Sequence, residues 1–179
     1  MAGNRVPPLL VGEGLRMRAA TAADAPFILS LRLDPGKNRH LGPTGADLAQ
    51  QVAWMERMER VPDHRYFIVE SEAGGPIGTL RLQIGADGHF GAHSLILAEG
   101  APRGAAMEVA RIVYDFALCR GLAGGRFETR TDNLRARLYF ERIGARLVTD
   151  DERHCHYEVT AEGMRRFLAG RRGAVAAAR

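Results

Sequence analysis

The chain has 179 residues, of which 46% are hydrophobic and 26% are charged, and its formal net charge is +4. This length and composition predict one globular domain with its own core. No apolar run approaches the roughly 20 residues of a membrane-spanning helix, so we expect no membrane partner.

The basic excess gathers toward the C-terminus, in Arg165, Arg166, Arg171, Arg172 and Arg179. Aromatic residues do not alternate with these arginines as they do in a base-stacking surface. An anionic small molecule therefore explains the charge as well as a nucleic acid does. A domain that binds nucleic acid through this tail is kept as one alternative.

The chain has two cysteines, Cys119 and Cys155, in segments predicted to be a helix and a strand. They do not form the spaced framework of a disulfide-rich domain. The apolar patch Val6–Val11 is interrupted by Pro7 and Pro8, so it does not have the pattern of a secretory signal. These features favour a reducing, cytoplasmic location.

The first part of the chain predicts a strand, two helices and a series of hairpins. Leu15–Ala19 alternates apolar and polar residues, as a half-buried strand does. Thr21 and Thr44 each begin a capping-box spacing that opens a helix. Three strands separated by glycine-rich turns follow, at Tyr66–Val69, Ile77–Ile84 and His89–Leu97.

The second part alternates helices and strands. We expect a helix from Gly104 to about Gly121, a strand at Arg126–Thr129, a helix at Asn133–Arg142, strands at Ala145–Thr149 and His154–Thr160, and a helix at Ala161–Leu168. The order predicts an α+β fold on one mixed, mostly antiparallel sheet. We expect a single domain over residues 13–169, with flexible termini at 1–12 and 170–179.

The most informative segment is Leu95–Val113. A short apolar strand leads into a loop of small residues and then into an amphipathic helix. Gly104 and the two alanines after it leave the backbone N–H groups of the first helical turn uncovered, and Arg103 adds a cation. Such a helix start suits a pyrophosphate. An ordinary strand-to-helix connection with small residues for close packing is the alternative.

This order and these motifs resemble the GNAT superfamily of N-acetyltransferases from Leu15 to Thr160. In that family a Gln/Arg-x-x-Gly-x-Gly/Ala loop holds the pyrophosphate of acetyl-CoA. Here Gly104 and Ala106 match the loop, whereas Ala101 departs from its polar first position. The resemblance implies a fold of the acyl-CoA N-acyltransferase type. It also implies cofactor contacts from Leu95, Ile96, Leu97, Ala101, Pro102, Arg103, Gly104, Ala105, Ala106, Asn133 and Phe140.

A second signature of the family is Asn-x-x-Ala/Ser at a helix start, which Asn133 and Ala136 match. The resemblance implies that Asn133 reaches the pantetheine arm, although a plain helix cap is the commoner reason for asparagine there. The family often places a tyrosine acid seven positions after this asparagine, where Phe140 stands. Tyr139 is therefore the candidate acid, although it lies about 100° around the helix from Phe140.

Acetyl transfer also needs a group that accepts a proton from the amine and a donor for the oxyanion. The candidate bases are His93, His89 and Glu70, of which His93 and Glu70 are retained as site residues. A solvated surface histidine is the alternative for His93. In the family, a backbone N–H near Leu97 is the usual oxyanion donor.

The loop between the first two helices is rich in cations and resembles the acceptor site of family members that acetylate nucleotide-linked amino sugars. Arg32, Lys37, Arg39 and His40 are the candidate acceptor-binding residues, with a solvated loop as the alternative. A protein N-terminus or a polyamine is the next choice of acceptor. A third possibility is a CoA-binding protein of this fold without turnover.

No metal site is expected. His154 and His156 lie two residues apart and so share one face of a strand, whereas Cys155 faces the other side and is expected to pack as a small hydrophobe. A homodimer paired along an edge strand at His154–Thr160 is a further expectation.

Overall fold

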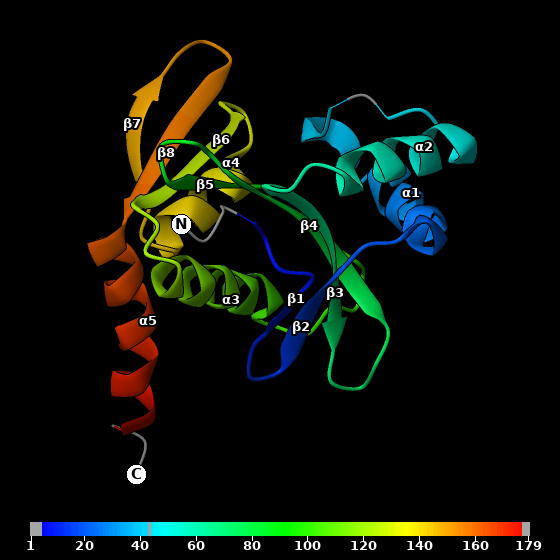
Figure 1. The fold of residues 1–179 in the computed structure, drawn as a ribbon. Coiled ribbons are helices and arrows are strands. Elements are labelled where there is room, and N and C mark those ends of the chain that lie inside the picture. The colour runs from blue at the N-terminus through cyan, green and yellow to red at the C-terminus, as the bar shows by residue number, and fades with distance from the viewer. Residues whose placement is uncertain (1–4, 43, 177–179) are drawn as a thin grey trace.

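The computed structural model describes residues 5–42 and 44–176. Its centre is an eight-stranded sheet in the order β1-β2-β3-β4-β5-β6-β8-β7 (Figure 1). The strands are β1 (Leu9–Val11), β2 (Leu15–Ala19), β3 (His64–Ser71), β4 (Pro76–Ile84), β5 (His89–Leu97), β6 (Gly124–Arg130), β7 (Arg146–Asp150) and β8 (His154–Thr160). The helices are α1 (Ala25–Leu33), α2 (Leu48–Glu59), α3 (Ala105–Cys119), α4 (Leu134–Arg142) and α5 (Ala161–Ala176), with short 3-10 turns at Ala22–Asp24 and Asn38–His40.

The two faces of the sheet are covered by different helices. Residues alternate along β3, so Phe67 and Val69 join the large core beneath α3, whereas Tyr66 and Ile68 pack with residues of α1 and α2. This alternation explains why β3 is apolar on both faces.

The sheet is mixed and mostly antiparallel, as predicted, because β5 and β6 are its parallel pair.

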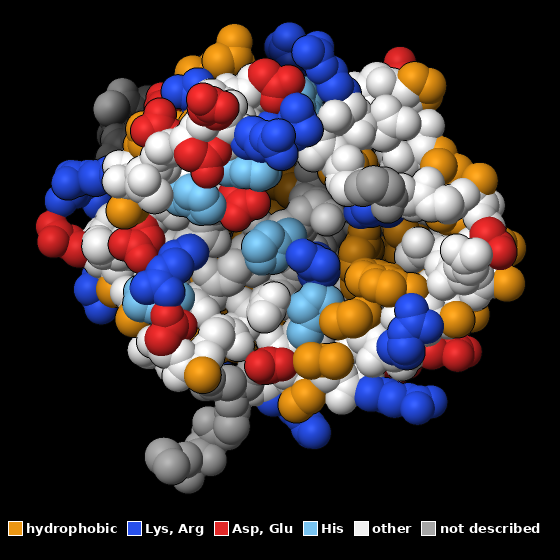
Figure 2. All heavy atoms as spheres, turned by 90° about the horizontal axis from the view of Figure 1, so that it is seen from above, with side chains coloured by type: hydrophobic (Ala, Val, Ile, Leu, Met, Phe, Trp, Pro, Cys, Tyr) orange, Lys and Arg blue, Asp and Glu red, His pale blue; other side chains and the backbone are white. Residues whose placement is uncertain are grey.

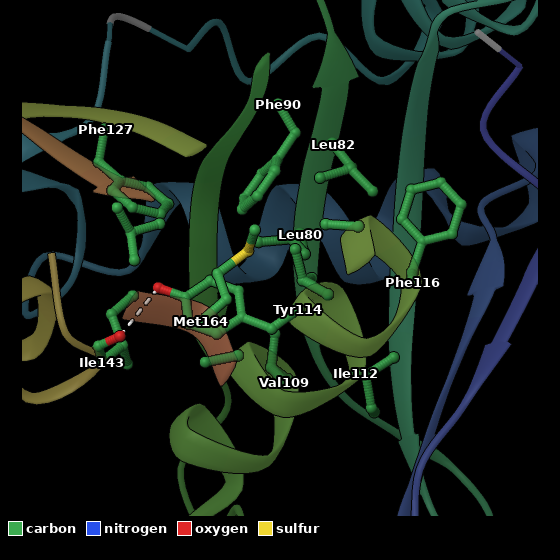
Figure 3. Close-up of a cluster of buried hydrophobic side chains, with 14 of the residues drawn as sticks. Leu80, Leu82, Phe90, Val109, Ile112, Tyr114, Phe116, Phe127, Ile143 and Met164 are labelled. Atoms are coloured by element: carbon green, nitrogen blue, oxygen red, sulfur yellow. Dashed lines mark hydrogen bonds between the residues drawn. The ribbon is translucent and has the colours of Figure 1, made fainter. Parts of the chain in front are cut away.

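The large core depends on the apolar stripe of α3. Val109, Val113, Tyr114 and Ala117 are each at most 3% exposed and lie against the sheet. The Tyr114 hydroxyl donates a hydrogen bond of 3.0 Å to the carbonyl oxygen of Ile143 at the end of α4 (Figure 3). This bond satisfies the one polar atom that the Tyr114 ring carries into the core.

The sheet opens between β5 and β6. These strands are parallel and pair only from His89 to Gly91 against Gly124 to Arg126. The second half of β5 is therefore paired with β4 alone. It also contains an irregularity, since its register shifts opposite Thr79–Arg81.

Ser94 lies at this irregularity. Its φ of 53° is the left-handed conformation, which among the described residues no other non-glycine residue adopts. The carbonyl oxygen of Ser94 accepts a hydrogen bond of 3.3 Å from the Thr79 hydroxyl across the strand pair. A bulge of this kind re-aims side chains and frees backbone groups, so it marks the place where β5 leaves regular pairing.

Elements of the fold extend into both segments that the sequence predicted to lie outside the domain. Within the expected flexible segment 1–12, Leu9–Val11 pairs with β2 and Val6 is fully buried, whereas residues 1–4 lie outside the described residues. The helix expected to end at Leu168 continues as α5 to Ala176. The alanines and arginines after Leu168 have high helix propensity, which favours this continuation.

The predicted edge strand is also corrected. β8 pairs with β6 on one side and with β7 on the other, so His154–Thr160 is not an edge. β7 is the edge, and its Leu147 and Val148 are exposed. Any pairing between two copies along this side of the sheet therefore has to use β7.

Candidate active site

A cavity of about 640 Å³ lies where β5 and β6 diverge. Its walls come from the end of β5, the first turns of α3, the end of β6, the start of α4 and the loop at 36–41. Seen from above in Figure 2, histidine side chains gather near the middle of this face, among both basic and acidic side chains.

The turn before α3 has the geometry of an anion cradle. Gly104 has a φ of 86° and no heavy atom within 4 Å of the position where a Cβ would stand. Among the described residues, the backbone N–H groups of Arg103, Gly104 and Ala106 have no hydrogen-bond acceptor, whereas that of Ala105 bonds to Pro102. Unpaired N–H groups at a helix start attract negative charge.

The predicted cofactor residues divide into those that line the cavity and those that form this turn. Leu95, Ile96, Leu97, Ala106, Asn133 and Phe140 line the cavity. Ala101, Pro102, Arg103, Gly104 and Ala105 do not line it, and Pro102, Arg103 and Gly104 are exposed just before Ala106. Ala105 is 3% exposed and packs in the core.

The N-terminus of α4 is capped as predicted. The side-chain oxygen of Asn133 accepts a hydrogen bond of 3.2 Å from the backbone N–H of Ala136. Asn133 also lines the cavity, so the same residue fixes the helix start and faces the cleft.

The two aromatic residues of α4 point in different directions. Phe140 is 9% exposed and stacks on Phe127, with a centroid distance of 5.1 Å, so it belongs chiefly to the core. The Tyr139 hydroxyl instead donates a hydrogen bond of 3.1 Å to the carbonyl oxygen of Ala106, in the first turn of α3. Burial raises the pKa of the Tyr139 phenol, so it stays protonated at neutral pH.

His93 lines the cavity from β5, directly opposite Arg81 of β4. Burial lowers the pKa of the His93 imidazole, as does the positive charge of Arg81, while the Glu128 carboxylate acts in the opposite direction. The result is a neutral imidazole at physiological pH, with a lone pair available to accept a proton.

Glu70 does not line the cavity. Its carboxylate is bound by Arg16 at 2.7 Å and by Arg18 at 2.8 Å. Burial tends to raise the pKa of Glu70, but the hydrogen bonds from the two arginines outweigh it and lower that pKa. The structure therefore makes Glu70 an ion-pair residue of β3, and the expectation that it serves as a base is not supported by its position.

The predicted acceptor loop meets the start of α4. The side chains of Arg39 and His40 lie 3.7 and 3.4 Å from the Asp132 carboxylate, just before Asn133. Lys37 forms an ion pair with Asp34 in its own loop. Lys37, Arg39 and His40 all line the first cavity, so the loop closes one side of it.

Arg32 lies elsewhere, in a second cavity of about 630 Å³. This cavity lies between α2, the residues Gly42, Thr44 and Gly45 that precede it, and the face of β3 and β4 that carries Tyr66 and Arg81. Ser94 lines both cavities, so the two meet at the bulge of β5. Sequence reasoning missed Tyr66, Arg81 and Ser94. The alternation in β4 could have identified Arg81, because Leu80 and Leu82 face the core and Arg81 between them faces the other side of the sheet.

The part of the chain that the structure describes contains no group of three or more His, Cys, Asp or Glu side chains placed to hold a metal. Cys155 is fully buried, and His156 Nδ1 lies 3.6 Å from a Glu128 carboxylate oxygen. Among the described residues, no helix is both long and apolar enough to cross a bilayer.

Comparisons with known proteins agree with this geometry. The family profile described as an acetyltransferase (GNAT) domain matches residues 14–146. The apo structure of FdhC, a nucleotide-linked sugar GNAT, superposes with a TM-score of 0.79 at 25% sequence identity, over 90% of this chain and 94% of that one. No curated protein sequence matches the chain.

Two further structures share the fold. A GCN5-related N-acetyltransferase from Brucella melitensis has a TM-score of 0.76 at 17% identity and covers 94% of this chain and 87% of its own. The spermidine N-acetyltransferase from Vibrio cholerae, solved with CoA and spermine, has a TM-score of 0.72 at 16% identity and covers 84% and 97%. The chain belongs to the GNAT family and is an acyl-CoA-dependent N-acetyltransferase.

Proposed function

We propose that this protein transfers the acetyl group of acetyl-CoA directly to the primary amine of a small acceptor. The observation that carries the proposal is the meeting of two cavities at Ser94 on the β5 bulge. One cavity has an anion-binding helix start at its side, and the other is lined by polar side chains. A donor and an acceptor can thus approach β5 from different sides.

The first cavity and the Gly104 turn beside it fit acetyl-CoA. The unpaired N–H groups around Gly104 suit the pyrophosphate, and Arg103 adds a charge. Leu95, Ile96 and Leu97 of β5, together with Asn133, are proposed to hold the pantetheine arm. When bound, the cofactor supplies an activated thioester carbonyl.

His93 is proposed as the group that accepts the proton of the attacking amine, directly or through a water. It lines the first cavity and lies one residue before Ser94, where the two cavities meet. Because its pKa is lowered, the imidazole is neutral at the pH at which the reaction must run.

Tyr139 is proposed as the acid that donates a proton to the departing thiolate. Its hydroxyl faces the first turn of α3 and keeps its proton because burial raises its pKa. A phenol that keeps its proton can donate a hydrogen bond to the sulfur as negative charge develops there.

The proposed acceptor is a nucleotide-linked amino sugar, and we place the reaction in the cytoplasm, where the two free thiols would persist. Arg39 and His40 at the first cavity and Arg32 at the second are suitable partners for phosphate. The similarity to FdhC supports this choice, while the similarity to the spermidine acetyltransferase keeps a polyamine as the second candidate.

The test is to measure CoA release with a panel of acceptors: nucleotide-linked amino sugars, spermidine, and a peptide with a free N-terminus. A kcat/KM that is at least tenfold higher for an amino sugar nucleotide supports the proposal. A higher kcat/KM for spermidine or for the peptide would show that a polyamine or a protein N-terminus is the acceptor instead. Tight acetyl-CoA binding without transfer to any amine would instead favour a CoA-binding protein that lacks turnover.

A further inference from the structure

The second cavity contains polar groups that no described residue satisfies. Tyr66 is 7% exposed, yet its buried hydroxyl has no hydrogen-bond partner. The Nε atom of Arg81 is likewise buried without a partner. Buried polar groups in native structures are normally hydrogen-bonded, so this pair points to a ligand that completes them.

The charge of this cavity is positive. Arg32, Arg57 and Arg81 line it together with one carboxylate, that of Asp47. Asp47 is occupied at the start of α2, where its side chain accepts hydrogen bonds from the N–H groups of Ala49 and Gln50. Within the described part of the chain, neither Arg32 nor Arg81 forms an ion pair with a carboxylate.

Arg32 is held in place and keeps donors to spare. Its Nε donates to the Thr44 hydroxyl at 2.8 Å, and a second nitrogen donates to the Gly42 carbonyl oxygen at 3.4 Å. A guanidinium has five N–H donors, so the others are available to a ligand. Burial lowers the pKa of Arg81, as does the positive charge of Arg32, so an anion beside Arg81 is favourable.

The row Tyr66–Arg81–His93 connects this cavity to the proposed reaction centre. Tyr66 is paired with Arg81 across β3 and β4, and Arg81 is paired with His93 across β4 and β5. Side chains opposite each other on neighbouring strands lie about 5 Å apart at Cβ. A group bound by Tyr66 and Arg81 is therefore about one strand spacing from His93.

We infer that the second cavity binds an anionic group of the amine acceptor, phosphate or carboxylate, through Arg32, Arg81 and the Tyr66 hydroxyl. This inference rests on the proposed acetyl transfer and narrows its acceptor class. The bound anion orients the acceptor so that its amine reaches Ser94 and His93. The same arginines repel a polyamine, which has no anionic group.

The binding test uses protein saturated with CoA, so that the pyrophosphate site at Gly104 is already filled. Calorimetry with inorganic pyrophosphate and with uridine diphosphate should show binding to the wild type. The affinity should fall at least tenfold in Arg81→Gln and severalfold in Tyr66→Phe, which removes only the hydroxyl. Arg60→Gln is the matched control, because Arg60 is exposed at the C-terminal end of α2 and lines neither cavity.

The kinetic test shows whether the anionic group of the acceptor is a phosphate or a carboxylate. KM is measured for glucosamine, glucosamine 6-phosphate, a nucleotide-linked amino sugar, an amino acid and spermidine. Arg81→Gln should raise KM for the phosphate or the carboxylate acceptor at least tenfold more than it raises KM for glucosamine. Arg81→Lys should be intermediate, because a lysine keeps the charge but loses the planar fork.

Three results would overturn the inference: equal anion affinity in wild type and Arg81→Gln, anion binding that disappears when CoA is present, or a wild-type preference for spermidine. Circular dichroism and thermal unfolding of each variant establish that it folds. Absence of transfer to every amine, with anion binding intact, would contradict the proposed function and leave the subsite standing.

Discussion

The hydroxyl of Tyr139 lies 3.1 Å from the carbonyl oxygen of Ala106, so one hydrogen bond joins α4 to the first turn of α3. These are the two helices whose starts carry the Gly104 turn and the Asn133 cap. The bond fixes the phenol at the wall of the first cavity, next to the place proposed for the cofactor.

Replacing Tyr139 with Phe is predicted to lower kcat by about 100-fold, because the variant loses the proton donor to the thiolate. Affinity for acetyl-CoA should stay within severalfold, and unfolding free energy should fall by about 1 kcal/mol from the lost hydrogen bond. Tyr157→Phe is the control, because it removes a hydroxyl that accepts a hydrogen bond from Arg137 on a residue that does not line the cavity. Equal kcat values for the two variants would assign Tyr139 a structural role only.

Replacing His93 with Gln is predicted to lower kcat by about 100-fold at neutral pH and to remove the acidic limb of the pH profile. The imidazole must be neutral to accept a proton, so activity is lost as the pH falls through its pKa. Burial and Arg81 place that pKa below the ordinary value of about 6.5. Retention of the acidic limb in His93→Gln would show that another group is the base.

His64 should make the fold less stable in mild acid. Burial lowers the pKa of this histidine to about 4, as do the charges of Arg81, His93 and Arg65, with Asp63 acting in the opposite direction. Between about pH 6.5 and 4 the unfolded chain binds a proton at His64 that the folded chain does not, so unfolding free energy falls as the pH falls.

The size of the His64 effect is about 3 kcal/mol over this range. Urea unfolding at pH 7 and pH 4 measures it, and His64→Gln should lose less stability on acidification than the wild type. An identical pH dependence in the variant would refute the assignment, since the carboxylates that also titrate there are common to both proteins.

Gly124 is predicted to be required for the pairing of β6 with β8. A Cβ at this position would lie 2.4 Å from the carbonyl oxygen of Val159, which belongs to the backbone and cannot turn away. Gly124→Ala should therefore lower unfolding free energy by about 1–3 kcal/mol. Gly170→Ala, where a Cβ meets nothing within 4 Å in helix α5, should be neutral or stabilising in the same thermal melt.

Most of the fold could be predicted from local patterns. Period-two alternation and glycine turns located the strands from β2 onward, and helical periodicity located the helices. The capping boxes predicted the helix starts less well, because Thr21 caps the 3-10 turn before α1 and Asp47, not Thr44, caps α2. β1 could not be found in this way, because three residues between Pro8 and Gly12 carry little pattern. β1 forms because it pairs with β2 and because Val6 beside it is buried, and both contacts exist only in the folded chain.

The candidate site was predictable only where its residues are adjacent in sequence. Gly104 and Asn133 stand at recognisable helix starts, and each is the N-cap residue of its helix. Tyr66, Arg81 and His93 come from three strands, and only the sheet register aligns them. Glu70 seemed a suitable base because it lies on a neighbouring strand, but its pairing with Arg16 and Arg18 depends on β2.

The central claim is that the cavity between β5 and β6 binds acetyl-CoA, and calorimetric titration tests it most directly. We predict about micromolar binding to the wild type that weakens at least tenfold in Gly104→Asp/Ala106→Asp, since the added carboxylates repel the pyrophosphate. Ala86→Asp/Ala123→Asp adds the same charge near the start of β5, away from both cavities, and should bind as the wild type does. Absence of binding to the wild type, or equal binding by the two folded double variants, would contradict the claim.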